Sequence, residues 1–423
     1  MIENFKKLIQ LKYLVLIFPI FLISIKIIGN LILLIIFLIG LRRYFVEHIN
    51  PFTNRDSKMI SIISIVYFFV ILFSIILNSG LGEEIRHIAR KLHYFLLPII
   101  SLAFINFQID SKKLILSLKI SLIFIGTIVC IQSLHSMFVL EDYIFGGSRY
   151  SGMINANVLG DIVVIIIFMS IVRVFDETSK ELLLTALSLG LGFVTLFQTG
   201  SRGSWITFIV LGLFFVFLKL KQLSFSVKNR KLFLSGIGIF LIIFSSLFIP
   251  KVLEIYDRTS NNLGAWGSNH EIYSSSGVRL EMWSAAFEAF KDAPWYGYGY
   301  RLANSKVSEY TEYHAELISS FTHLHNEYIT NLLSAGIPGL ISLLVMIFIP
   351  FFFFYKSRKT DENYIFSIMG ICLTLGYAIS GFTHIAFGEE HLNAFYVLYL
   401  SLLVLLIKNN QNLLASKINK RAL

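Results

Sequence analysis

Long apolar runs recur along the whole chain, separated mostly by short polar segments. A helix needs about 20 apolar residues to cross the hydrocarbon core of a membrane. The pattern predicts twelve spans, at 12–25, 27–41, 59–78, 94–108, 114–131, 154–173, 182–198, 205–218, 232–249, 330–355, 364–383 and 391–407. The predicted fold class is therefore all-α, a polytopic membrane helical bundle of about 12 transmembrane helices with one large, partly helical loop outside the membrane.

The polar segment before the tenth run is the longest interruption of this pattern. Three regions follow from it: an N-terminal transmembrane region with about nine helices, the large loop, and a C-terminal transmembrane region with about three helices and a cytoplasmic tail. Their bounds are 1–249, 250–326 and 327–423. Within the loop, Arg279–Lys291 is predicted to be a helix, because Trp283, Phe287 and Phe290 recur at helical spacing on one face.

Composition excludes a soluble globular domain. The chain has 423 residues, of which 56% are hydrophobic and only 15% charged, and its mean hydropathy is +0.72. Its formal net charge is +10, and the positive-inside rule explains this charge better than nucleic-acid binding does. With both termini in the cytoplasm, the inner segments hold 23 Lys and Arg, whereas the short outer loops after the second span hold five, namely Arg86, Arg90, Lys91, Arg149 and Arg202.

Arginine is scarce in the predicted outer loops, so those found there at helix ends are candidates for a function. Arg202 lies in the turn 198–204, where glycines and serines let backbone N–H groups approach an anion while the guanidinium adds charge-assisted hydrogen bonds. The alternative is an anchor for lipid headgroups. Arg279 begins the loop helix, where its charge opposes the helix dipole unless an anion binds there. For Arg279, and equally for the weaker candidates Arg149 and Arg301, the alternative is a solvated arginine.

A histidine at the start of the tenth span carries the candidate chemistry. A neutral imidazole at His325 can take a proton from a sugar hydroxyl, and nearby arginines would lower its pKa and keep it neutral. Asn326 and Glu327 can orient the ring, although Glu327 is equally explained as a first-turn helix acid. Two alternatives stay open for His325: a structural histidine, or a metal pair with His323, which their i, i+2 spacing at a helix start disfavours.

No Asp-x-Asp metal-binding motif occurs in the sequence. We therefore expect no metal and no cofactor, and any pyrophosphate would be neutralised by arginines. The two cysteines, Cys130 and Cys372, both lie in apolar runs and predict no disulfide framework. Asp161 lies within a predicted span, where an acid is a candidate functional residue; the alternative is simple pairing with polar groups of a neighbouring helix.

Taken together, these motifs resemble the O-antigen ligase family, part of a superfamily that also contains O-antigen polymerases and pilin oligosaccharyltransferases. The resemblance rests on the Thr-Gly-Ser-Arg-Gly turn ending at Gly203, on Gly-Val-Arg-x-x-x-Trp from Gly277 to Trp283, and on His-Asn-x₉-Gly-x-x-Gly beginning at His325. The last of these is the most specific. The segment 149–155 is a looser match.

The resemblance implies a reaction and its participants. Such ligases transfer O-antigen polysaccharide from undecaprenyl pyrophosphate to a sugar hydroxyl of lipid A–core oligosaccharide, at the periplasmic face of the bacterial inner membrane, without metal or nucleotide. The implied catalytic residues are His325, Arg202 and Arg279, and the expected substrate-binding residues are Arg149, Arg301 and Asn326. The expected partners are the lipid-linked donor, the lipid A–core acceptor and membrane lipids, with no nucleic acid.

Other functions compete with this one. A polysaccharide polymerase of the same superfamily would share the fold and the His and Arg positions. An oligosaccharyltransferase that acts on protein is disfavoured, because little sequence follows Ile407. Internal inverted repeats and broken helices near the bilayer midplane would favour a transporter of lipid-linked glycans, and neither feature is visible in the sequence. A structural membrane anchor would leave the outer arginines and His325 unexplained.

Overall fold

The computed structural model describes residues 10–78, 85–139, 149–222, 275–311, 315–321 and 323–422. Within these residues every regular element is a helix, which confirms the predicted all-α class. In chain order the helices are α2 (Leu11–Ser24), α3 (Lys26–Val46), α4 (Lys58–Asn78), α5 (Ile85–Leu102), α6 (Ser111–Val139), α7 (Ala156–Ser170), the short η1 (Val174–Asp176), α8 (Ser179–Thr199), α9 (Arg202–Gln222), α11 (Ser275–Asp292), α12 (Gly299–Glu309), α13 (Ala315–Ser320), α14 (Glu327–Ser357), α15 (Asp361–Ser380) and α16 (Glu390–Ala422).

The predicted count of about 12 spans is not confirmed. Among the described residues, seven helices are long and apolar enough to cross a membrane: parts of α3, α4, α6, α8, α14, α15 and α16. Helices α2, α7 and part of α9 are apolar but shorter. The span expected at 94–108 instead belongs to α5, which starts earlier and carries charged residues in its first turns. The span expected at 232–249 lies outside the described residues.

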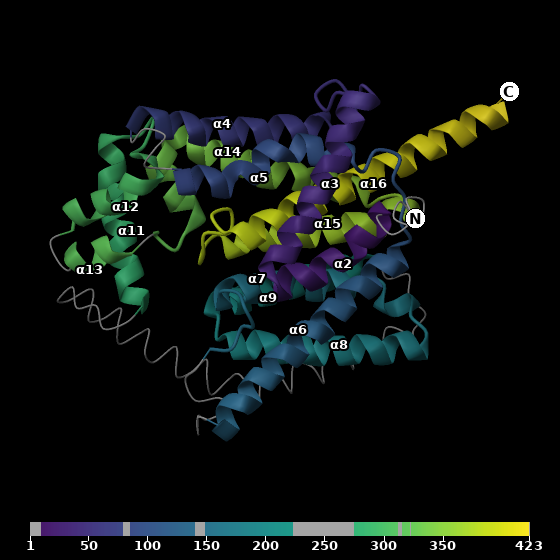
Figure 1. The fold of residues 1–423 in the computed structure, drawn as a ribbon, viewed down its shortest axis with the longest axis horizontal. Helices are drawn as coiled ribbons and strands as arrows, with labels where there is room; N and C mark the ends of the chain where they lie inside the picture. The colour runs from purple at the N-terminus through teal and green to yellow at the C-terminus, as the bar shows by residue number, and fades with distance from the viewer. Residues whose placement is uncertain are drawn as a thin grey trace.

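Most of these helices run side by side along the long direction of the molecule, and α11, α12 and α13 gather at one end (Figure 1). The far end of α16 lies away from them, at the other end of the molecule. Helix α16 contributes most to the core, because 94% of its most apolar window is buried. Helices α5 and α15 pack against it.

The membrane helix α14 is broken near its start. Ala335 and Gly336 depart from helical geometry, and Gly336 has a φ of +66° that glycine adopts without strain. The loop between α11 and α12 binds the backbone groups that the break sets free. The Tyr298 amide donates to the Leu333 carbonyl at 3.0 Å, and the Ile337 amide donates to the Pro294 carbonyl at 2.8 Å. The break therefore attaches the loop helices to the bundle.

The helix expected over 279–291 is present as α11, with its start four residues earlier. The prediction of its apolar face is partly wrong. Trp283 and Phe290 pack against a small core at this end of the molecule, but Phe287 is 50% exposed. The buried face is lined mainly by small side chains, because α11 packs closely on α12 and α14; these residues are Val278, Met282, Ala285, Ala286 and Ala289.

Candidate functional site

A cavity of 410 Å³ lies at the α11–α13 end of the molecule. Its walls come from segments far apart in the sequence: the start of α7 and the residue Arg149 before it, the turn between α8 and α9, the start of α11, and the loops before α14 and α16. Four of the residues expected at the site line this cavity together, namely Arg149, Arg202, Arg279 and His325. Three positive charges and one imidazole therefore face a single space.

Arg149 is held by the ends of two helices. Its Nε donates to the carbonyl of Thr199 at 2.6 Å, where α8 ends, and its Nη2 donates to Oδ1 of Asn157 at 2.6 Å, where α7 begins. A cation at a helix C-terminus is favoured by the helix dipole. Gly200 follows with a φ of +57°, which ends α8 and turns the chain toward Arg202. These contacts fix Arg149 in the cavity wall.

Arg202 is the first residue of α9 and is exposed, whereas the serines on either side of it are buried. The hydroxyl of Ser204 donates to Oδ1 of Asp161 at 2.8 Å, and it lies 2.8 Å from the hydroxyl of Ser201. These contacts anchor the turn to α7. The guanidinium of Arg202 thus extends from a fixed backbone whose first N–H groups begin a helix, an arrangement that favours anions.

Arg279 lies in the first turns of α11 and is half-buried. Burial lowers the pKa of its guanidinium, and so do the positive charges of Arg202 and Arg149. About one turn after Arg279, α11 is fixed to the loop before α14, because the indole Nε1 of Trp283 donates to the carbonyl of Leu324 at 2.8 Å. This bond sets the position of Arg279 relative to the next residue along that loop, His325.

His325 sits in a tight turn with a φ of +52°, which is uncommon for a residue other than glycine. Its backbone N–H donates to Nδ1 of His323 at 3.2 Å, and the two rings lie 4.1 Å apart. Burial lowers the pKa of His325 to about 3, helped by His323 and Arg279. The ring is therefore neutral at pH 7, and its Nδ1 is buried without a hydrogen-bond partner among the described residues.

A second histidine lines the same cavity. His384 lies in the loop between α15 and α16, with only 4% of its surface exposed, and its Nδ1 lies 3.6 Å from Oδ2 of Asp161. The neighbouring Thr383 packs against Gly203, where a Cβ would collide with the threonine hydroxyl. This loop, the turn that carries Arg202 and the start of α7 therefore form one packed unit.

The other expected site residues lie elsewhere. Arg301 is exposed on α12 and is not among the residues that line the cavity. Asn326 caps α14, since its Oδ1 accepts from the amides of Tyr328 at 3.0 Å and Ile329 at 3.1 Å. The carboxylate of Glu327 contacts Lys91 at 3.4 Å and accepts from the amide of Phe387 at 2.9 Å. The structure therefore gives Asn326 a helix-capping role beside the cavity.

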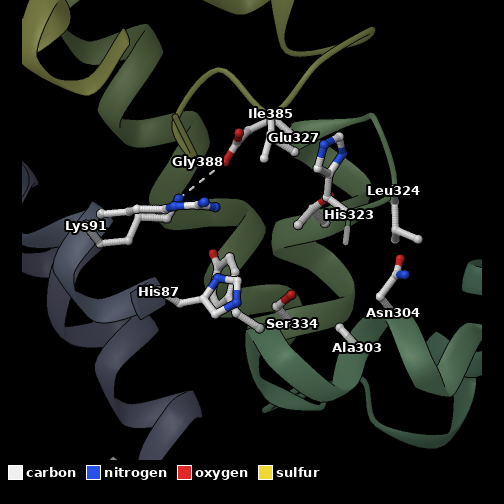
Figure 2. A pocket seen from close by; sticks show the side chains of 13 residues that line it. His87, Lys91, Ala303, Asn304, His323, Leu324, Glu327, Ser334, Ile385 and Gly388 are labelled. Atoms are coloured by element: carbon white, nitrogen blue, oxygen red, sulfur yellow. Dashed lines mark hydrogen bonds and ion pairs between the residues drawn. The ribbon is translucent and has the colours of Figure 1, made fainter. Parts of the chain in front are cut away.

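A buried polar cluster around Glu327 lies next to the loop that carries His323 and His325 (Figure 2). Lys91 of α5 approaches Glu327 at 3.4 Å and donates to the hydroxyl of Tyr67 at 2.8 Å, while Asn331 donates to Glu327 at 2.7 Å. The adjoining space of 30 Å³ suits about one or two water molecules. His323 lines this small space and also contacts His325, so the cluster adjoins the main cavity.

The cavity is suited to a multiply charged anion. Its lining holds three guanidinium groups, while among the described lining residues Asp161 is the one carboxylate. Guanidinium groups bind phosphate oxygens in paired hydrogen bonds. Within the described part of the chain, no group of three His, Cys, Asp or Glu side chains is placed to hold a metal ion. The arrangement can hold a phosphate-bearing molecule next to a neutral imidazole.

The described chain is thus a helical membrane protein with a cationic cavity at one end. Residues 187–344 match the family model described as O-antigen ligase. The chain is 26% identical over 332 residues to an uncharacterized protein of Haemophilus influenzae, which covers 76% of this chain and 78% of that protein. It is also 26% identical over 195 residues to an O-antigen ligase of Escherichia coli, covering 44% of this chain and 43% of that protein.

These matches confirm the resemblance to the O-antigen ligase family, and they support membership of the superfamily of O-antigen ligases and polymerases. The match to the Escherichia coli protein spans less than half of either chain. The region matched by the family model contains Arg202, Arg279 and His325, whereas Arg149, Asp161 and His384 lie outside it.

Sequence reasoning missed His384, which lies next to Asp161 in the structure. His384 and Asp161 are separated by more than 200 positions, so their pairing depends on how α7 and α15 pack. One signal was available. The charge pattern assigns the loop that carries His384 to the same side of the membrane as His325, so a histidine there was a candidate for the same site.

Proposed function

We propose that this protein is an O-antigen ligase. It transfers O-antigen polysaccharide from undecaprenyl pyrophosphate to a sugar hydroxyl of lipid A–core oligosaccharide, at the periplasmic face of the bacterial inner membrane. The observation that carries the proposal is the meeting of Arg149, Arg202, Arg279 and His325 at one cavity. The family match supports the reaction class, and the distribution of Lys and Arg supports a cavity on the side away from the cytoplasm.

In this proposal the arginines hold the diphosphate of the donor. A diphosphate linked at both ends carries two negative charges, and three guanidinium groups compensate them without a metal ion. Charge stabilisation of this kind is strong in a site that excludes water, because the groups are already oriented before the reaction begins. The position of Arg149 and Arg202 on anchored helix ends supplies that orientation.

His325 serves as the base. In the empty cavity its pKa of about 3 makes it a weak one. Part of that lowering comes from the charge of Arg279, and a bound diphosphate cancels that charge. The pKa of His325 therefore rises when the donor binds. The imidazole becomes a useful proton acceptor only in the donor complex, which disfavours wasteful reaction with water in the empty site.

The acceptor hydroxyl attacks the anomeric carbon from the side opposite the diphosphate. Its O–H bond breaks and the proton passes to His325, while the new C–O bond forms. The bond from the anomeric carbon to the diphosphate oxygen breaks, and its electron pair stays on that oxygen, where the arginines stabilise the added charge. The configuration at the anomeric carbon is inverted.

A transfer assay with purified lipid-linked donor and lipid A–core acceptor tests this mechanism. Replacing Arg279 by Ala removes a charge stabiliser and is expected to lower turnover by about 10²–10³. His325→Ala is expected to lower it at least as far. Lys291→Ala is the matched control, because Lys291 lies on the same helix with its side chain 65% exposed and paired with Glu288. Near-normal turnover in either site variant would contradict the proposal.

A deletion strain separates the ligase from a polymerase of the same superfamily. Loss of a ligase leaves lipid A–core without any O-chain, while polymer accumulates on the lipid carrier. Loss of a polymerase instead leaves core that bears a single repeat unit. We expect the first pattern, and the second would reassign the acceptor to another lipid-linked repeat while leaving the donor site unchanged.

A further inference from the structure

The proposed mechanism leaves one buried pair of ionisable groups without a role. His384 and Asp161 both line the cavity, and each is less than 5% exposed. Their nearest polar atoms, Nδ1 and Oδ2, lie 3.6 Å apart, and both atoms are without a hydrogen-bond partner among the described residues. Two buried polar atoms that face each other just beyond hydrogen-bond distance indicate a pair whose bond forms in another state of the site.

The surroundings of His384 decide which state that is. Positive or titratable groups reach it from several elements: His323 and His325 from the loop before α14, Arg279 from α11, and Arg149 from the segment before α7. Together with burial they lower the pKa of His384 to about 3, so its ring is neutral in the empty cavity. Burial is the largest of these causes, and an anion among the arginines cancels the part that comes from their positive charges. What remains beside the ring is the carboxylate of Asp161.

The other two histidines are less suited to carry a charge. Nδ1 of His323 already accepts the backbone N–H of His325. Nδ1 of His325 is buried with no partner among the described residues. Only His384, among the histidines that line this cavity or contact them in the described structure, has a carboxylate within 4 Å. An imidazolium is stabilised by a carboxylate at its Nδ1, and its Nε2–H, on the other side of the ring, is then a donor to phosphate.

Resting on the proposed function, which supplies the diphosphate, we propose that His384, paired with Asp161, is a proton-linked contact for that group. When the diphosphate enters the cavity, one proton moves from solvent to the lone pair of His384. The imidazolium closes the hydrogen bond to Asp161 through Nδ1 and faces the phosphate oxygens as a further positive group. When the lipid diphosphate leaves, His384 returns the proton to solvent.

Binding of a small diphosphate diester tests this inference. The probe is P¹,P²-dimethyl diphosphate, whose two charges do not change near neutral pH, and the protein is the full chain purified in detergent. For the wild type, Kd is expected to rise with pH between 6 and 8, by no more than the limit of tenfold per pH unit for one linked proton. For His384→Gln, Kd is expected to be independent of pH and weaker than the wild-type value at pH 6. Asp161→Asn is expected to flatten the dependence as well.

Matched variants make the result specific. His323→Gln should keep the wild-type pH dependence, and calorimetry in buffers of different ionisation enthalpy should show proton uptake in this variant but not in His384→Gln. A pH dependence retained in His384→Gln, or absent in the wild type, would overturn the inference while leaving the ligase proposal standing. Failure of the wild type to bind the diester at any pH would overturn both. If His384→Gln does not fold, His384→Asn replaces it.

Discussion

The arginines of this site are positioned by contacts that neighbouring residues make. Arg149 is held by a helix end, Arg202 starts a helix, and Arg279 is located by the bond from Trp283 to the next loop. The backbone that carries each arginine is thus fixed before any anion binds, and the side chain of Arg149 is held as well. Preorganisation of this kind is what gives charged groups their effect in catalysis.

The bond between Trp283 and Leu324 is predicted to matter more for activity than for stability. Trp283→Phe keeps an aromatic ring but removes the Nε1 donor, which costs about 0.5–1.5 kcal/mol of stability. Turnover in the transfer assay is expected to fall roughly tenfold or more, because α11 loses its fixed distance to the loop that carries His325. Phe287→Leu, an exposed position on the same helix, should leave turnover unchanged. Equal turnover in both variants would contradict this prediction.

The buried histidines predict a loss of stability in acid. His323, His325 and His384 have pKa values of about 4, 3 and 3 in the fold, against 6.5 in an unfolded chain. Between these values the unfolded chain binds protons that the folded chain does not, so stability falls as pH decreases below about 6.5. Thermal unfolding midpoints measured from pH 8 to pH 5 should decline, and less steeply in His325→Asn.

A matched control for this acid effect is available on α6. His135 is exposed there, and His135→Asn should leave the decline unchanged. A midpoint that stays constant down to pH 5 in the wild type would show that these histidines titrate normally.

Sequence motifs located His325, Arg202 and Arg279 because each belongs to a short local pattern. They could not show which distant groups surround them. Asp161 was recognised as an unusual acid within a span, yet its contacts with Ser204 and His384 depend on three helices meeting. Glu327 was ambiguous in sequence, and its contact with Lys91 likewise depends on packing.

The helices that matter most for the site are α11 and α14, which are joined at the break in α14. Gly336 allows the break, and the loop between α11 and α12 is bonded to the backbone there. The sequence placed glycines at this point but did not show that a second segment docks on them. Helical periodicity predicted where α11 lies in the sequence. It did not predict which face is buried, because close packing places alanines on that face and leaves Phe287 exposed.

Gly336→Ala is predicted to destabilise the protein. A Cβ at this position would lie 2.5 Å from the carbonyl carbon of Trp295, and the φ of +66° is strained for alanine, which together cost about 1–3 kcal/mol or more. Turnover should fall as well, because the docking of α11 is disturbed. Gly190→Ala on α8 is the control, since no described atom outside the backbone of its own helix segment lies within 4 Å of a Cβ placed there, and it should gain about 0.5–1 kcal/mol. Equal effects of the two changes would contradict this account.

The molecule as a whole is held together by contacts between distant parts of the chain. The pair of Lys91 and Glu327 joins α5 to the start of α14, with side chains 3% and 2% exposed. Hydropathy predicted a bundle of membrane helices, and this class is confirmed. It did not predict the start of α5, because the charged residues in the first turns lower the hydropathy there, although one of them, Lys91, is buried.

Replacing one partner of the Lys91–Glu327 pair is predicted to lower the stability of the protein more than replacing both partners. Lys91→Met leaves a buried carboxylate without its cation, and such a change costs about 3–5 kcal/mol. Lys91→Met combined with Glu327→Gln should be less destabilised than Lys91→Met alone, because no unpaired charge is left. Unfolding midpoints of the two single variants and the double variant measure the coupling. A double variant whose loss equals the sum of the two single losses would show that the pair is not coupled.

The central claim is that the arginines and His325 surround one lipid diphosphate, and a structure of the protein with undecaprenyl pyrophosphate bound tests it most directly. The account predicts both phosphates in the 410 Å³ cavity, within hydrogen-bond distance of Arg202 and Arg279 and next to His325. Phosphates bound away from these three side chains, with the cavity left empty, would contradict it.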